Sequence, residues 1–257
     1  NVDIQEFMVV PHGFDTFPEA LRAGVETYHA LKSELKHDGR LGGVGDEGGF
    51  APDLPTNEDG LRYMVRAIES AGYSTDEIGI ALDVASTEFF SDGTYKFDGQ
   101  AMDSEALGEI YGRWIDDYPL LSIEDGFAED DWRGWSHFES INGKKIQTVG
   151  DDLFVTQSER LAQGIESNAA NAILVKLNQV GTVTETLETM NLAKQHAMNC
   201  VISHRSGETE DTTISDFAVG TRAGQIKTGA PCRSDRVAKY NQLLRISEEV
   251  SEFCSPF

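Results

Sequence analysis

Asn171-Ala-Ile-Leu-Val-Lys-Leu-Asn-Gln179 is the stretch that decides the fold. Its apolar run, Ala172 to Val175, has the length and β-branched content of a strand buried in a parallel sheet. Lys176 follows that run directly. A charged ammonium at the end of a buried strand is costly unless it is paired or serves a function. The alternative is a lysine whose stem is buried and whose ammonium reaches solvent. The residues that end the other strands distinguish between a functional Lys176 and this alternative.

Similar short apolar runs recur at a regular spacing, with helical patterns of apolar residues between them. They begin near Ile80, Leu120, Ile146, Ala172, Cys200 and Gln225. This alternation predicts a parallel sheet with right-handed crossovers, either a closed barrel or an open doubly wound sheet. No Gly-x-Gly-x-x-Gly follows the first strand, which counts against a dinucleotide-binding fold. One longer interval holds Ser91-Asp92-Gly93, which predicts the turn of a hairpin.

The ends of the chain add further elements. Ile4 to Val10 is predicted to be a strand, and Thr16-Phe17-Pro18-Glu19 has the form of a helix-capping box. The glycine-rich stretch from Gly42 to Pro52, with Asp46-Glu47 at its centre, is either an ordered functional loop or a flexible linker. Other helices are predicted from Thr16 to about Gly39, from about Asn57 to Ala71, and from about Ser234 with Val237, Tyr240, Leu243 and Leu244 inward.

Composition limits the functions that are plausible. The 257 residues, 39% of them hydrophobic, suit one large domain. A net charge of −23 should repel nucleic acid and anionic membranes. No apolar run approaches the ~20 residues of a membrane span. Cys200, Cys232 and Cys254 are too scattered for a disulfide framework or a zinc motif, which favours a reducing cytoplasm. The chain opens at Asn1 without a methionine, from which we expect a fragment of a longer protein.

Polar residues end one predicted strand after another. They are Asp83, Glu124 with Asp125, Asp151 with Asp152, Lys176, the segment Ser203-His204-Arg205-Ser206, and Lys227. In a parallel barrel these ends share one rim, where catalysis takes place in this fold.

Three carboxylates that converge on one rim need a cation to neutralise them. Carboxylate oxygens are hard ligands, so Mg²⁺ is the expected ion, with open positions for water and substrate. The alternative is that each carboxylate caps a helix or pairs with a lysine.

Ser203-His204-Arg205-Ser206-Gly207 combines a guanidinium, hydroxyls and backbone amides ahead of a predicted helix. That combination suits a phosphate or a carboxylate. Neither serine has the Gly-x-Ser-x-Gly context of a nucleophile, and His204 is either structural or catalytic. Metal ions, an anion clamp, a buried lysine and glutamates Glu6 and Glu47 together favour removal of a proton next to a carboxylate.

At these residues the sequence closely resembles the enolase family. The resemblance runs from Gln5 to Arg245 and includes three long motifs, Val44-Gly-Asp-Glu-Gly-Gly-Phe-Ala-Pro52, Ser122-Ile-Glu-Asp-Gly-Phe-Ala-Glu-Asp-Asp-Trp132 and Gly150-Asp-Asp-Leu-Phe-Val-Thr156. Lys176-Leu-Asn-Gln, Ser203 to Thr213 and Gly224 to Gly229 follow in the family's order.

The resemblance implies an Mg²⁺-dependent lyase of glycolysis and gluconeogenesis that interconverts 2-phosphoglycerate and phosphoenolpyruvate. It implies that Asp83, Glu124 and Asp151 bind Mg²⁺, that Lys176 removes the C2 proton, and that Glu47, helped by Glu6, protonates the departing C3 hydroxyl. It places Arg205 and Ser206 on the phosphate, Lys227 on the carboxylate, and His204 near the leaving group. Gln5, Glu6, Glu124, Asp151 and Ser203 complete the implied substrate pocket.

The implied fold is a (β/α)8 TIM-type barrel of the enolase kind over residues 1–257, without the family's N-terminal α+β domain and first barrel strand. The resemblance further implies a cytoplasmic protein, at least dimeric, with a second Mg²⁺ that takes a serine from the absent domain. Residues 1–257 alone are therefore expected to be poorly active. The tail from Ser251 to Phe257 receives no role.

Two alternatives remain. A sister enzyme that acts on sugar acids would lack the Ser203–Ser206 clamp. A non-catalytic fragment could act as a binding protein, as enolases at cell surfaces do through C-terminal lysines, but this chain ends in Ser-Pro-Phe.

Overall fold

The structure, a computed structural model, describes residues 1–250 and 252–257. The chain forms two compact units, each built from two separate segments. Unit 1 comprises Asn1–Met8 and Ile80–Val201, and unit 2 comprises Val9–Gly79 and Ile202–Phe257. Three strands, β1 (Glu6–Pro11), β4 (Ile78–Asp83) and β11 (Asn199–Ser203), contain residues of both units.

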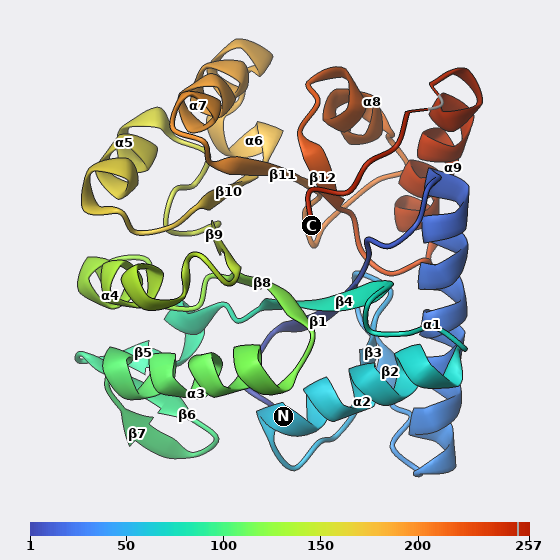
Figure 1. Cartoon of the computed structure of the whole chain (residues 1–257), viewed down its shortest axis with the longest axis horizontal. Helices are drawn as coiled ribbons and strands as arrows, with labels where there is room; N and C mark the ends of the chain where they lie inside the picture. Colours follow the sequence, from blue (N-terminus) through green and yellow to red (C-terminus); the bar gives the residue numbers. More distant parts are fainter. Residues whose placement is uncertain (251) are drawn as a thin grey trace. The chain divides into compact units, whose positions relative to one another are not determined.

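Unit 1 is built on a sheet in which the order of strands is β1-β4-β8-β9-β10-β11 (Figure 1). β8 spans Leu120–Glu124, β9 spans Gln147–Gly150 and β10 spans Ala172–Val175. The pairs β4–β8, β8–β9 and β9–β10 are parallel. Every residue of β4, β9 and β10 is buried, which explains the nearly continuous apolar runs of β4 and β10, whereas β9 also buries the polar Gln147 and Thr148. The predicted parallel sheet and its strand positions are confirmed.

The strand register aligns the carboxyl ends of these strands. Asp83 lies opposite Glu124, Glu124 lies opposite Val149, and Val149 lies opposite Ala172. Asp151 and Lys176 come directly after the carboxyl ends of β9 and β10, at the same edge of the sheet as Asp83 and Glu124 but further along the strand direction.

Helices and a small antiparallel sheet complete unit 1. The predicted turn at Asp92 and Gly93 is confirmed: both residues have left-handed backbone, with φ of 50° and 77°. The turn joins β5 (Phe90–Ser91) to β6 (Thr94–Phe97), which also pairs with β7 (Gln100–Met102). The helical elements are η1 (Ser86–Phe89), α3 (Ser104–Asp117), α4 (Trp132–Asn142), α5 (Ser158–Ser167), α6 (Leu177–Val180) and α7 (Val183–Gln195).

The core of unit 1 contains both aliphatic and aromatic side chains. Val149, Ala172, Leu174 and Val201 form a buried cluster contributed by β9, β10 and β11. The buried aromatic rings pack edge-on or tilted against one another and comprise Tyr95, Phe97, Tyr111, Trp114, Phe127, Trp135 and Phe138. Such contacts are favourable ring geometries, and they hold β6, α3 and α4 together.

Unit 2 contains the remaining elements. The Oγ1 of Thr16 accepts the amide N–H of Glu19, so the predicted capping box begins helix α1 (Phe17–His37). The segment from Gly42 to Pro52 is an ordered loop, because β2 (Gly43–Val44) pairs with β3 (Phe50–Ala51) inside it. The other elements are α2 (Asn57–Ser70), α8 (Thr213–Gly220), β12 (Gly224–Lys227), which follows β11 in the order of strands, and α9 (Ser234–Glu249).

The helix expected after Ser206 is present as α8, which begins at Thr213, and a loop separates it from Ser206. Helix α9 begins where predicted, but its most buried residues are Arg236, Lys239 and Leu243. Val237, Tyr240 and Leu244 are only half-buried. The apolar pattern therefore missed two cations on the inner face of α9.

Among the described residues, no helix has the length and apolar character to cross a membrane. The cysteines Cys200, Cys232 and Cys254 are free in the structure. Ser251, where the unassigned tail begins, lies outside the described residues.

Candidate active site

Three carboxylates predicted to bind a metal follow neighbouring strands of unit 1. Asp83 and Glu124 are opposite one another at the ends of β4 and β8, with 5% and 3% of their surface exposed. Asp151 follows β9 and is 7% exposed. Carboxylates are almost never buried to this degree without a partner. This edge of the sheet therefore concentrates negative charge away from water.

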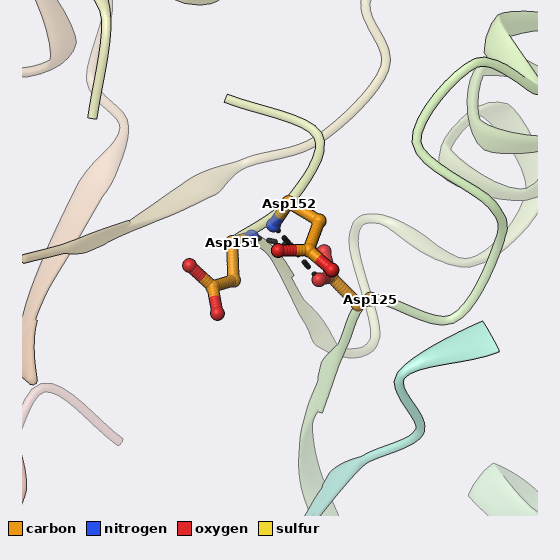
Figure 2. Close-up of side chains that lie close together, drawn as sticks. All are labelled: Asp125, Asp151 and Asp152. Atoms are coloured by element: carbon orange, nitrogen blue, oxygen red, sulfur yellow. Dashed lines mark hydrogen bonds between the residues drawn. The ribbon is translucent and has the colours of Figure 1, made fainter. Parts of the chain in front are cut away.

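Asp125 determines the shape of the turn after β9. Its carboxylate accepts the amide N–H of Asp151 at 2.9 Å and of Asp152 at 2.8 Å (Figure 2). One carboxylate oxygen from each of Asp125, Asp151 and Asp152 lies within 4.8 Å of the others. Burial raises the pKa of Asp125 well above its usual range, and the charges of Asp151 and Asp83 add to that rise. Asp125 thus orients the backbone of Asp151 and lies close enough to feel the negative charge of its carboxylate.

Lys176 pairs with this cluster. Its Nζ donates to Oδ2 of Asp151, and the side chains of Lys176 and Asp151 are 17% and 10% exposed. The ammonium is therefore held at the carboxylates and is not a head that reaches into solvent.

A chain of hydrogen bonds supports this ion pair. Gln179 Nε2 donates to Asp151 Oδ1 at 3.2 Å, and Thr156 Oγ1 donates to Gln179 Oε1 at 2.6 Å. Thr156 Oγ1 also accepts the backbone N–H of Lys176 at 3.0 Å. Thr156 is fully buried and has φ of 55°, an unusual conformation for a β-branched residue. One strained residue therefore fixes both partners of the ion pair.

This donor set suits Mg²⁺. The oxygens of Asp83, Glu124 and Asp151 are hard ligands on adjacent strands. Burial, together with the charges of Asp151 and Asp83, raises the pKa of the neighbouring Asp125. The compact cluster of Asp125, Asp151 and Asp152 shares only Asp151 with the predicted ligands. Both oxygens of Asp125 already accept amide hydrogens, which favours a supporting role for that residue.

Unit 2 carries a second group of predicted residues around Glu47. Ser206 Oγ donates to Glu47 Oε1 at 3.0 Å, and His204 Nε2 lies 3.2 Å from Glu47 Oε2. Burial alone would raise the pKa of Glu47, but His204, Lys227 and Ser206 outweigh it and lower that pKa to about 2. Glu47 is consequently an ionised, oriented carboxylate at neutral pH.

Close backbone contacts hold the loop that carries Glu47. The amide of Ala230 donates to Glu47 O at 2.9 Å. Gly229 has φ of +84°, and a Cβ there would lie 2.8 Å from Glu47 O. Gly48 has φ of +86°, and its Cβ would lie 2.6 Å from Cys232 O. Glycine is required at both positions, since any side chain would push the two loops apart.

The other predicted residues are divided between the units. Ser203 and His204 are buried, whereas the side chain of Arg205 is exposed. His204 N donates to Lys227 O at 3.0 Å, which joins the end of β11 to the end of β12. Gln5 and Glu6 belong to unit 1, where Glu6 begins β1.

A family model described as "Enolase, C-terminal TIM barrel domain" matches residues 1–255. The chain belongs to the enolase family. A curated relative, the enolase of Beutenbergia cavernae, is 57% identical over 253 residues, which are 98% of this chain and 59% of that protein. The chain thus spans 59% of the length of that enolase. The family match confirms the predicted TIM-barrel class and decides against an open doubly wound sheet.

In this enolase-family chain, sequence reasoning missed residues that support the predicted groups. Asp125 was visible next to Glu124, yet its position in the sequence could not show that it accepts amide hydrogens from the next turn. Thr156 and Gln179 lie in motifs shared with the enolase family, but their hydrogen bonds to Lys176 and Asp151 join residues that are distant in sequence. Arg236 carried no signal beyond a charge within a helix.

Proposed function

We propose that this enolase-family chain carries the catalytic groups of a lyase that interconverts 2-phosphoglycerate with phosphoenolpyruvate and water. The observation that carries the proposal is the Lys176–Asp151 ion pair at the ends of β10 and β9, beside the buried Asp83 and Glu124. A lysine held against carboxylates supplies a base next to a site for a cation, which is what removal of a proton α to a carboxylate requires.

Asp83, Glu124 and Asp151 would hold Mg²⁺. When bound, this ion would supply positive charge that offsets the charge building up on the substrate carboxylate as the C2 proton leaves. Asp125 would keep Asp151 in place through its two amide contacts.

Lys176 would accept the C2 proton on Nζ. In this structure Nζ donates to Asp151, and Lys176 must be a neutral amine at the moment it accepts the C2 proton. A metal ion bound to Asp151 would weaken that contact and favour the neutral amine.

Glu47 would serve as the acid for the departing C3 hydroxyl, helped by Glu6. The depressed pKa of Glu47, about 2, describes the substrate-free protein. A substrate that carries carboxylate and phosphate charges would raise that pKa and so promote protonation. In the hydration direction the ionised form is the useful one, because it accepts a proton from water.

Basic and polar groups would hold the substrate. Arg205 and Ser206 would bind the phosphate, which suits a guanidinium beside a hydroxyl. Lys227 would bind the carboxylate. Ser203, His204 and Gln5 would complete the pocket.

Exchange of the C2 hydrogen tests these roles separately. In the natural protein that carries this sequence, Lys176→Ala should abolish exchange of the C2 hydrogen with solvent deuterium. Glu47→Gln should keep exchange but lose dehydration, measured as absorbance of the enolpyruvate product. Equal loss of exchange in both variants would contradict separate base and acid roles, and absence of turnover in the wild type would contradict the proposed function.

We also propose a place in glycolysis and gluconeogenesis, in the cytoplasm, as a homodimer or larger assembly. These follow from the proposed reaction and from the family. Sedimentation of the natural protein measures the oligomeric state, and a monomer with full turnover would contradict that part.

A further inference from the structure

Arg236 is a fully buried cation on the inner face of α9. Its guanidinium donates from Nη1 to Arg205 O at 2.7 Å, and from Nη2 to Ser206 O at 2.7 Å and Asp46 O at 3.2 Å. Its Nε lies 3.4 Å from Asp235 Oδ2. Backbone carbonyls from two loops, together with one carboxylate, thus stabilise a charge that would otherwise be costly to bury. Those loops carry Glu47 and the Ser203–Ser206 segment.

The same guanidinium also contacts the imidazole of His204. Arg236 Nη1 lies at hydrogen-bond distance from Nδ1 of His204. A guanidinium nitrogen has only hydrogens to offer and is not deprotonated in proteins. Nδ1 must therefore be the acceptor, so His204 is neutral and carries its single proton on Nε2.

The surroundings of His204 favour this neutral form. His204 is 2% exposed. Burial lowers its pKa, and the charges of Arg236 and Lys227 lower it further, while Glu47 acts in the opposite direction. The nitrogen Nε2 lies 3.2 Å from Glu47 Oε2, although the two are not aligned as a hydrogen bond in this structure.

We propose that Arg236 is a positioning residue that fixes His204 as the Nε2–H tautomer, so that the imidazole presents a hydrogen to Glu47. A fixed donor faces the Glu47 carboxylate without competing for its proton, because Nε2 already carries a hydrogen and the lone pair of Nδ1 is engaged by Arg236. His204 therefore acts as an oriented donor and does not act as an acid or base. The catalytic consequence rests on the proposed function of Glu47, whereas the tautomer does not.

Nitrogen-15 NMR of the histidine side chains tests the tautomer directly. The chain has 6 histidines, and loss of one signal set in His204→Gln assigns His204. In the wild type, His204 should show only the Nε2–H form and should not titrate near neutral pH. A protonated His204, or the Nδ1–H form, would overturn the proposal without any Arg236 variant.

Variants on the same helix separate positioning from packing. Arg236→Met should release His204, which then shows mixed tautomers and titrates at higher pH than in the wild type. Lys239 is the matched control, since it is 1% exposed and donates to Glu208 Oε2 at 2.8 Å and Asp235 O at 2.6 Å. Lys239→Met removes an equally buried cation and should leave the His204 spectrum unchanged. An unchanged spectrum in folded Arg236→Met, or the same change in Lys239→Met, would refute the proposal.

Arg236→Lys keeps the charge but cannot reach all the acceptors, which gives a folded variant if Arg236→Met does not fold. We expect it to slow dehydration by about tenfold or more, within the range for loss of acid–base assistance. Exchange at C2 should stay within about twofold of the wild type, since it depends on Lys176. Equal loss of dehydration and exchange would refute the positioning role. If wild-type His204 is the Nε2–H tautomer but the wild-type protein does not exchange the C2 hydrogen, the proposed function is contradicted and the tautomer is not.

Discussion

Replacement of Asp151 by asparagine is the sharpest perturbation of the proposed metal site. The change keeps an oxygen for the Gln179 contact at 3.2 Å but removes one negative charge. Lys176 then loses its counter-charge, and the repulsion of Asp151 with Asp125 and Asp152 also disappears. These two consequences have opposite signs in the metal-free protein.

The magnitudes can be compared. Carboxylate oxygens within 4.8 Å of one another repel by roughly 3 kcal/mol for each ionised pair at an effective dielectric constant of about 20. The attraction between Lys176 and Asp151 is of similar or slightly larger size than one such repulsion because the two groups are in direct contact. Since Asp151→Asn removes two repulsions and one attraction, the metal-free variant should be as stable as the wild type or more stable, by up to ~3 kcal/mol.

The effect of Asp151→Asn on Mg²⁺ binding is not offset by an opposing effect of this kind. Changes to groups that only support a ligand reduce metal affinity by about 10 to 100-fold, and loss of a ligand charge should cost at least as much. Mg²⁺ at about 100 times its Kd stabilises the wild type by about 2.7 kcal/mol. A 100-fold weaker variant at the same concentration would gain only about 0.4 kcal/mol.

Calorimetric titration with Mg²⁺ and thermal unfolding with and without Mg²⁺ measure both quantities. Asp152→Asn is the matched control, because Asp152 lies in the same turn and the same cluster but outside the proposed ligands. It should keep Mg²⁺ affinity within about threefold, whereas Asp83→Asn should resemble Asp151→Asn. Unchanged binding in Asp151→Asn refutes the site. Equal losses in Asp151→Asn and Asp152→Asn would assign the ion to the Asp125–Asp151–Asp152 cluster instead.

Three further predictions concern the supporting structure. The pKa of Glu47 is lowered from 4.5 to about 2, so its contribution to stability is present above pH 4.5 and is lost as the pH falls toward 2. The free energy of unfolding, measured by urea unfolding between pH 4.5 and pH 2, should therefore depend less on pH in Glu47→Gln than in the wild type. Thr156→Val leaves the buried N–H of Lys176 without its acceptor and should lower the free energy of unfolding by about 1–3 kcal/mol, while Thr156→Ser should restore most of it. Gly229→Ala should destabilise by roughly 1–3 kcal/mol because of its left-handed φ and the close Glu47 carbonyl; Gly220→Ala, with open space around its Cβ, is the control and should not destabilise.

The sequence predicted the sheet well because buried parallel strands leave a local signal. Each apolar run was visible in the sequence, and the polar residue that ends it had a fixed place once the strands were parallel. The register that brings Asp83 opposite Glu124 follows from that pattern. The start of α1 was equally local, since Thr16 and Glu19 form the cap within one turn.

The supporting residues could not be predicted because their partners are distant in sequence and include backbone atoms. Asp125 is satisfied by two amides of another strand end, and Thr156 by the amide of Lys176. Arg236 is the extreme case, because carbonyls from two loops stabilise its charge. A carbonyl is present at every residue, so nothing in the sequence marks those that receive a cation. Periodicity placed Val237 and Tyr240 inward because it counts apolar side chains. The buried positions of α9 include instead Arg236 and Lys239, one residue before Val237 and Tyr240, and both cations donate hydrogen bonds to backbone carbonyls.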